Sequence, residues 1–266
     1  MTTPPVVLTI AGSDNSCGAG AQADLKTITA LGGYAQTAIT CVVAEVPGRV
    51  EAIQAMRPDL VAAQIRLSFE AFPVAALKTG MLFSTAIIRA VATALEEVGR
   101  RPPLVVDPVM VASSGDPLLK PSAIAAYGER LFPLATLVTP NLDELRVLSG
   151  MPCRDIDEMK HAGAFLVNRH GCAFLLKGGH LRCETATDIL ATLDGFEMFT
   201  APFVKNIDAH GTGCTFSAAI ATHLARGYPL SDAVRLSKEY ITRAIEMRLC
   251  WKSTTALEHR MPPSAG

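Results

Sequence analysis

The stretch that decides the fold covers residues 208–217 and reads DAHGTGCTFS. Asp208 leads into two glycines, Gly211 and Gly213, which stand on either side of Thr212, and an apolar helical pattern follows. A glycine-rich turn that opens a helix presents several unpaired backbone N–H groups at one point, and the helix dipole adds positive potential there. We therefore predict an anion site, most simply for phosphate, at this turn.

Cys214 falls in the first turn of the predicted helix. The positive potential at a helix start favours thiolate over thiol, so we expect a lowered pKa for this side chain. A nucleophile or base that faces an anion site is an arrangement for phosphoryl or acyl transfer. The same residues also fit a plain loop-to-helix junction with a buried cysteine, and this stretch alone does not decide between the two.

Strand and helix patterns alternate along most of the chain. Strands are expected at residues 6–11, 35–44, 48–55, 75–78, 104–107, 137–139, 173–177, 187–191 and 197–201. Helices are expected at residues 21–31, 58–72, 84–98, 121–131, 141–148, 157–170, 212–226 and 231–247. This alternation predicts an α/β fold with a mostly parallel central sheet and helices on both faces. No repeat or linker divides the chain, so we expect a single domain over residues 1–266, with a loosely ordered tail from residue 250.

Composition excludes several classes of protein. Hydrophobic residues make up 49% of the chain and charged residues 18%, and the net charge is −1. The chain is therefore globular, and it lacks the basic surface that nucleic acid or an anionic membrane would need. No apolar run approaches the ~20 residues of a membrane span, and no signal peptide is expected. Seven scattered cysteines without metal spacing fit reduced thiols in the cytoplasm.

Polar residues gather where the predicted strands end. In parallel sheets ligands bind beyond the carboxyl ends of the strands, so these residues should share one rim. The rim segments are residues 12–14, 45, 78–81, 107–110, 141–144, 177–180 and 208–214.

Four residues on this rim suggest phosphate chemistry. Asn141 and Glu144 lie three apart at a helix start, hence on one face, and can hold Mg²⁺ through water molecules. The same spacing also fits a helix N-cap with its capping-box partner, and spacing alone favours the cap. Asp107 is a further candidate to hold the ion from its outer shell, through water molecules. Lys177 ends a strand before two glycines and is placed to pair with phosphates.

A second glycine-rich stretch, residues 18–23, reads GAGAQA and matches part of a dinucleotide fingerprint, with Glu45 at the end of the next strand. Residues 12–17 separate it from the first strand, so close approach of the backbone to a small substrate is the better interpretation. Asp24 follows, one turn into the helix. It either stabilises the helix dipole or accepts a hydrogen bond from a substrate hydroxyl or amine.

A series of motifs in one order then covers most of the chain. They are TIAGSD (9–14), GAG (18–20), QADLKT (22–27), KTGML (78–82), VDPVMVA (106–112), SGDPLL (114–119), TPN (139–141), LKGGH (176–180) and HGTGCT (210–215). With these motifs the chain resembles the hydroxymethylpyrimidine/phosphomethylpyrimidine kinases of thiamin biosynthesis, in the ribokinase-like superfamily. The resemblance covers roughly residues 6–247.

The resemblance implies a three-layer αβα fold, ATP and Mg²⁺ as cofactors, and a homodimer. It also implies transfer of the γ-phosphoryl group to the hydroxymethyl group of an aminopyrimidine, and then to its monophosphate. Gly211, Thr212 and Gly213 would form the anion hole, with Cys214 as the general base where most of the superfamily has Asp. The residues implied at the pyrimidine are Gly12, Asp24, Glu45, Met81 and Val109. Those implied at the nucleotide and metal are Lys177, Asn141, Asp208, Glu144 and Asp107.

The chain departs from the family in three places. Glu45 replaces a glutamine, and a carboxyl donates a hydrogen bond only when protonated, which burial favours; alternatively, the ring nitrogen binds in its protonated form. Ser113 stands where the family often has lysine, and the family's C-terminal signature is absent. Two other functions stay open: a pyridoxine/pyridoxal kinase, or a catalytically silent protein that binds a pyrimidine or a nucleotide.

Overall fold

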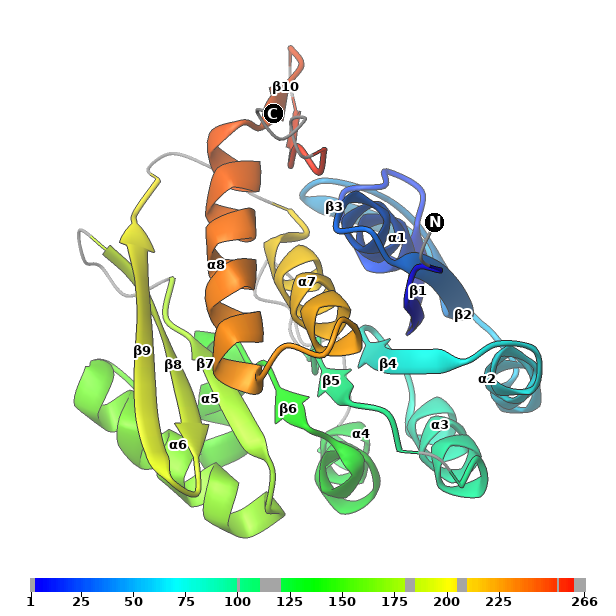
Figure 1. The fold of residues 1–266 in the computed structure, drawn as a ribbon, viewed down its shortest axis with the longest axis horizontal. Helices are drawn as coiled ribbons and strands as arrows, with labels where there is room; N and C mark the ends of the chain where they lie inside the picture. The colour runs from blue at the N-terminus through cyan, green and yellow to red at the C-terminus, as the bar shows by residue number, and fades with distance from the viewer. Residues whose placement is uncertain are drawn as a thin grey trace.

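A nine-stranded sheet runs through the molecule in the computed structural model, which describes residues 3–99, 101–110, 121–179, 185–204, 210–252 and 254–260 (Figure 1). The strand order is β3-β2-β1-β4-β5-β6-β7-β8-β9. Neighbouring strands from β2 to β7 are parallel, and β3, β8 and β9 add antiparallel edges. The strands are β1 Val6–Asp14, β2 Tyr34–Val46, β3 Arg49–Ala55, β4 Val74–Thr79, β5 Leu104–Val106, β6 Leu137–Val138, β7 Ala173–Lys177, β8 Thr185–Thr192 and β9 Gly195–Pro202. The predicted mostly parallel sheet is confirmed.

Helices cover both faces of this sheet (Figure 1). They are α1 Gly20–Ala30, α2 Pro58–Ala71, α3 Thr85–Glu97, α4 Pro121–Ala126, α5 Leu142–Ser149, α6 Ile156–His170, α7 Thr212–Ala225 and α8 Leu230–Glu246. Helices α1, α7 and α8 lie on one face, and α2 to α6 lie on the other. The predicted three layers are therefore present.

The core is divided by the sheet into two apolar clusters. Along β1, Val6, Leu8 and Ile10 belong to the cluster under α2 to α6, whereas Val7 packs in the cluster that includes Phe216 of α7. Alternate side chains of a strand point to opposite faces, so a strand covered on both sides is apolar at every position. This explains why the central strands are continuous apolar runs in the sequence.

Two expected segments differ from the structure. The helix expected at residues 121–131 is α-helical only to Ala126 and continues as a π-helical turn, Tyr127–Leu131. The expectation of a loosely ordered tail from residue 250 is wrong for the described part. Strands β10 Leu249–Cys250 and β11 Thr255–Ala256 pair, and the segment that follows is buried. The reason is Leu257, which enters the apolar cluster of α7 and α8.

No described helix has both the length and the apolar character to cross a membrane. Asp208, His180 and Ser113 fall outside the described residues, so the expectations for them are not carried further.

Candidate active site

The predicted anion turn lies at the start of α7. Gly211 is the N-cap residue and has a φ of 86°, a left-handed conformation that suits glycine. A Cβ at this position would collide with the carbonyl oxygen of Gly18. The N–H of Thr215 donates the first helical hydrogen bond to the Gly211 carbonyl, at 2.9 Å. The two glycine-rich stretches of the sequence are thus in contact, and only glycine fits at their closest point.

A partly buried ion pair lies directly beside the turn. A Cβ on Gly213 would lie 3.1 Å from Lys177 Nζ and 3.5 Å from Asp107 Oδ2. Lys177 Nζ donates to Asp107 Oδ1 at 3.0 Å. Burial by itself lowers the pKa of Lys177, but the carboxylates of Asp107 and Glu144 outweigh it and hold the pKa above its usual value. A fixed ammonium therefore accompanies the backbone N–H groups of the turn, as an anion site requires.

The carboxylate of Asp107 joins the sheet to α7. It follows β5, and its Oδ1 also accepts a hydrogen bond from Thr139 Oγ1 at 3.3 Å. Ser217, in the second turn of α7, donates to Oδ2 at 3.3 Å. Asp107 is buried, so these donors fix its orientation.

Asn141 and Glu144 form the capping box that their spacing predicts. Asn141 Oδ1 accepts hydrogen bonds from the N–H groups of Asp143 and Glu144, both at 2.9 Å. The two oxygens of Glu144 accept from the N–H groups of Asn141 at 2.9 Å and Met110 at 3.0 Å. Burial raises the pKa of Glu144 to about 7. A role toward a metal ion stays a prediction for both residues.

The thiol of Cys214 corrects one expectation. Cys214 is half-buried in the first turn of α7. Burial raises its pKa to about 11; Lys78 opposes this increase, whereas Asp24 and Asp107 add to it. The expected thiolate is therefore wrong for the described structure, because loss of solvent and nearby carboxylates outweigh the field of the helix start.

Asp24 also differs from its expected role. Its side chain is fully buried, and Lys78 Nζ donates to both carboxylate oxygens at 2.9 and 2.8 Å. Thr9 Oγ1 donates a further hydrogen bond at 2.5 Å. With its oxygens occupied and no exposed surface, Asp24 is not placed to accept a hydrogen bond from a substrate. It is the buried partner of Lys78, whose pKa it raises against the effect of burial.

The other expected substrate residues line the carboxyl ends of β1, β2, β4 and β5. A Cβ on Gly12 would lie 2.8 Å from Cys41 Sγ and 3.8 Å from Met81 Cβ, so Gly12 and Met81 are close neighbours. Val109 has a φ of 38°, a strained conformation for a β-branched residue. Such strain is characteristic of sites where the surrounding structure holds a residue for function. Contact of these residues with a substrate stays a prediction.

Glu45 belongs to a group of three side chains that the sequence did not identify as neighbours. Asp14, Glu45 and His210 bring potential ligand atoms within 4.8 Å of one another. His210 Nε2 lies 3.2 Å from Asp14 Oδ2. Burial raises the pKa of Asp14, but hydrogen bonds from His210, Ser16 and Ala19 outweigh it and lower the pKa to about 2.

The environment of Glu45 raises the pKa of its carboxyl group. Burial and the Asp14 carboxylate raise its pKa, against a smaller effect of His210. Asp14 and His210 both lie in rim segments of the sequence, but nothing in their spacing, 196 positions apart, indicates that they meet.

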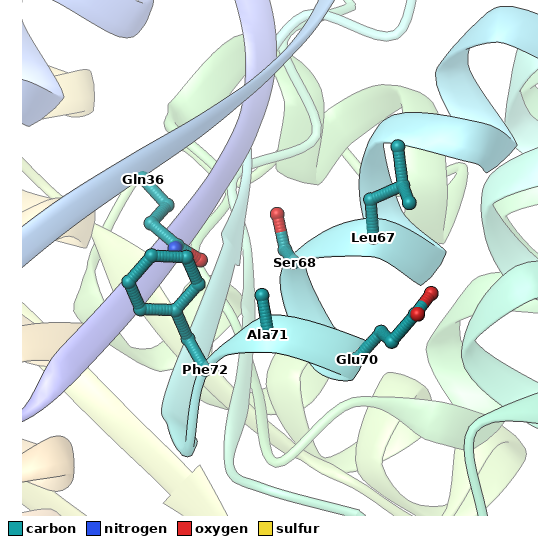
Figure 2. Close-up of a pocket in the computed structure, with 6 residues that line it drawn as sticks. All are labelled: Gln36, Leu67, Ser68, Glu70, Ala71 and Phe72. Carbon is teal, nitrogen blue, oxygen red and sulfur yellow. The ribbon is translucent and has the colours of Figure 1, made fainter.

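A hollow elsewhere on the molecule is separate from this rim. Figure 2 shows its lining by Gln36 of β2 and by the last turn of α2 up to Phe72. Gln36 lies near the amino end of β2 and pairs with Leu8. The candidate site instead lies at the carboxyl ends of the strands, so this hollow takes no part in it.

Comparison of the sequence with known families and proteins agrees with the site. The sequence profile of the family "Phosphomethylpyrimidine kinase" matches residues 14–258. The "Thiamine biosynthesis bifunctional protein ThiED" of Geobacter sulfurreducens is 46% identical over 91% of this chain; the chain spans about half of that protein, 49% of its length. The "Hydroxymethylpyrimidine/phosphomethylpyrimidine kinase" of Rhizobium meliloti is 44% identical over 90% of both chains.

Solved structures with the same fold include two kinds of kinase. A phosphomethylpyrimidine kinase from Clostridium difficile superposes with a TM-score of 0.80 at 40% identity, covering 91% of this chain and 99% of the other. An ADP complex of Bacillus subtilis pyridoxal kinase gives a TM-score of 0.88 at 35% identity, covering 97% and 98%. The similarities confirm the predicted ribokinase-like fold and phosphotransferase class.

Proposed function

This chain belongs to the phosphomethylpyrimidine kinase family, and from that premise we propose that it transfers the γ-phosphoryl group of ATP to hydroxymethylpyrimidine and then to phosphomethylpyrimidine. The observation that supports this most directly is the anion turn of α7 beside the partly buried Lys177–Asp107 pair. Phosphoryl transfer needs positioning and neutralisation of charge more than covalent chemistry by the protein. A turn of N–H groups with a fixed ammonium supplies both.

In this proposal each group of the site has one task. The N–H groups of Gly211 to Gly213 bind the oxygens of the transferred phosphoryl group, and Lys177 compensates their charge. The thiolate form of Cys214 accepts the proton of the substrate hydroxyl late in the reaction, because a loose transition state leaves the attacking oxygen little changed until then. With a thiol pKa of about 11 the thiolate is the minor form near pH 7, so this step should become faster as the pH rises.

The residues present fit a magnesium ion. Asp107 and Glu144 supply oxygen donors, the ligands that Mg²⁺ prefers. Their carboxylates already accept hydrogen bonds from Lys177, Ser217 and backbone N–H groups, so they would hold the ion through water molecules. A bound magnesium ion would neutralise phosphate charge beside the anion turn.

The proposed function is tested by incubating the protein with Mg-ATP and one of three acceptors: hydroxymethylpyrimidine, its monophosphate or pyridoxal. A fourth sample without an acceptor is the control. Transfer to both pyrimidines with little transfer to pyridoxal supports the proposal. Transfer to pyridoxal alone would assign the chain to vitamin B6 salvage instead. Two observations favour that second candidate: solved pyridoxal kinases superpose closely, and a glutamate stands at position 45.

Two finer expectations belong to the same proposal. A homodimer is supported by exposed apolar side chains on the β2–β3 edge, where Val42, Val46 and Val50 are 45–46% exposed; light scattering behind a sizing column measures it. A cytoplasmic location agrees with the free cysteines among the described residues and stays a prediction.

A further inference from the structure

The C-terminal segment of residues 257–260 packs against the start of α7. Leu257, Glu258 and His259 are all buried, with exposed fractions of 3%, 9% and 5%. Leu257 packs in the same apolar cluster as Phe216 of α7. The chain thus returns, 44 residues after Thr215, to the helix that carries the anion site. The family profile ends at residue 258, so it assigns nothing to His259.

Helix α8 holds this segment in place through its backbone. The hydroxyl of Tyr240 donates to the His259 carbonyl at 2.8 Å. The N–H of Glu258 donates to the Ala244 carbonyl at 3.2 Å. The position of the His259 ring is therefore set by an adjacent long helix and not by the loop that precedes it.

The ring of His259 contacts the first turn of α7. Its Nε2 lies 3.1 Å from Oγ1 of Thr215, which is fully buried and follows Cys214 directly. Burial lowers the pKa of His259 to about 4, so the ring is neutral near pH 7. A neutral imidazole can accept the hydroxyl proton of Thr215 or donate to its oxygen, and either hydrogen bond fixes the hydroxyl.

The first turn of α7 depends on such contacts. The first four N–H groups of a helix have no partner within it, and two of the residues here, Gly211 and Gly213, are the least restrained type. On the side of the sheet, Ser217 anchors the helix to Asp107. Two residues before Ser217, Thr215 is hydrogen-bonded through its hydroxyl to the ring of His259.

We propose that His259 is a positioning residue for the kinase reaction: through Thr215 it fixes the first turn of α7, and with it the anion turn and Cys214. The C-terminal segment is then part of the apparatus of the active site although it touches no reacting atom. This inference rests on the proposed function for its kinetic readout only. Its structural readout, the order of the α7 start, is independent of activity.

The test compares His259→Ala, His259→Gln, Thr215→Val and the double variant His259→Ala/Thr215→Val. For His259→Ala and Thr215→Val we expect kcat to fall about tenfold with the KM for hydroxymethylpyrimidine nearly unchanged, because a small misplacement of aligned groups slows the chemical step. The double variant should be no slower than either single variant, since both remove one interaction. His259→Gln, which keeps a hydrogen-bonding group, should recover part of the rate.

Hydrogen exchange of the α7 start gives the second readout. His259→Ala should increase amide exchange at residues 212–216, and the matched control Arg260→Ala should not, because that exposed side chain pairs only with its neighbour Glu258 in the described structure. A His259→Ala protein that loses thermal stability but keeps its kcat and its exchange at residues 212–216 would overturn the proposal. If the unmodified protein transfers no phosphate to any acceptor, the proposed function is wrong, and the exchange result alone decides the role of His259.

Discussion

Cys214 shows how one residue can be correctly located and wrongly characterised from the sequence. The helix start is where the sequence places it. The sequence does not predict the pKa of the thiol, because it does not reveal that folding buries this side chain and brings Asp24 and Asp107 near it. A spacing pattern identifies a helix terminus, whereas the charge around a side chain depends on residues far along the chain.

The proton-accepting role of Cys214 predicts a definite pH profile. With a thiol pKa of about 11, the thiolate fraction rises roughly tenfold per pH unit below that value. If the thiolate accepts the proton, kcat should increase from pH 7 to pH 9, and Cys214→Ala should be slower with a flatter profile. Cys172→Ala, which changes a buried cysteine of the segment before β7, is the control. A Cys214→Ala enzyme with the profile of the unmodified protein would rule out this role.

Asp24 gives a second prediction at the same scale. Removing its charge leaves the ammonium of Lys78 buried without a counter-ion, so Asp24→Asn should lower the free energy of unfolding by about 3–5 kcal/mol. Urea denaturation measures this change. The double variant Asp24→Leu/Lys78→Met should recover much of the loss, since an apolar pair needs no compensation. An Asp24→Asn protein of normal stability with a raised KM for the pyrimidine would restore the substrate role expected from the sequence.

At the scale of elements, α7 carries a buried histidine that links its stability to pH. His223 is 6% exposed, and its Nδ1 has no hydrogen-bond partner in the described structure. Burial lowers its pKa from 6.5 to about 4. The unfolded chain therefore binds a proton that the folded chain does not, and His223 costs stability as the pH falls from 6.5 toward 4.

Replacement of His223 should remove this cost. The comparison is the free energy of unfolding of His223→Gln minus that of the unmodified protein. This difference should be more favourable to the variant at pH 5 than at pH 7, by on the order of 1 kcal/mol after allowance for solvent screening. Urea denaturation at the two pH values measures the difference. If it is the same at both, the ring is not held neutral in the folded protein.

Most elements could be predicted because their patterns are local. The apolar strands and the helix starts near residues 84 and 141 are read from nearby residues, and Ser84 and Asn141 are the N-caps of these helices. The C-terminal segment could not be predicted in this way. Its order comes from the packing of Leu257 against Phe216 and from the hydrogen bonds of His259 to Tyr240 and Thr215. These partners are distant in sequence, and the composition of the segment gives no periodic signal.

At the scale of the whole molecule, the parallel sheet explains why the sequence identified so much of the site. Parallel strands direct all their carboxyl ends to one edge, so residues that follow strands meet without any knowledge of side-chain contacts. Asp107 and Lys177, 70 positions apart, are brought together by this rule. Asp24 lies inside a helix and not at a strand end, and the rule gives no guidance on which way its side chain faces.

If the anion turn of α7 carries phosphoryl transfer to the pyrimidine, a change in this turn should slow the reaction. The most direct test follows products by mass spectrometry with Mg-ATP and hydroxymethylpyrimidine, for the unmodified protein and Gly213→Ala. The added Cβ would crowd Lys177 Nζ at 3.1 Å, so the variant should fold, as circular dichroism will report, but lose at least about tenfold in rate. We expect one and then two phosphoryl groups on the pyrimidine with the unmodified protein. Equal product from a folded Gly213→Ala protein would exclude this role of the turn, and no product from the unmodified protein would exclude the kinase activity.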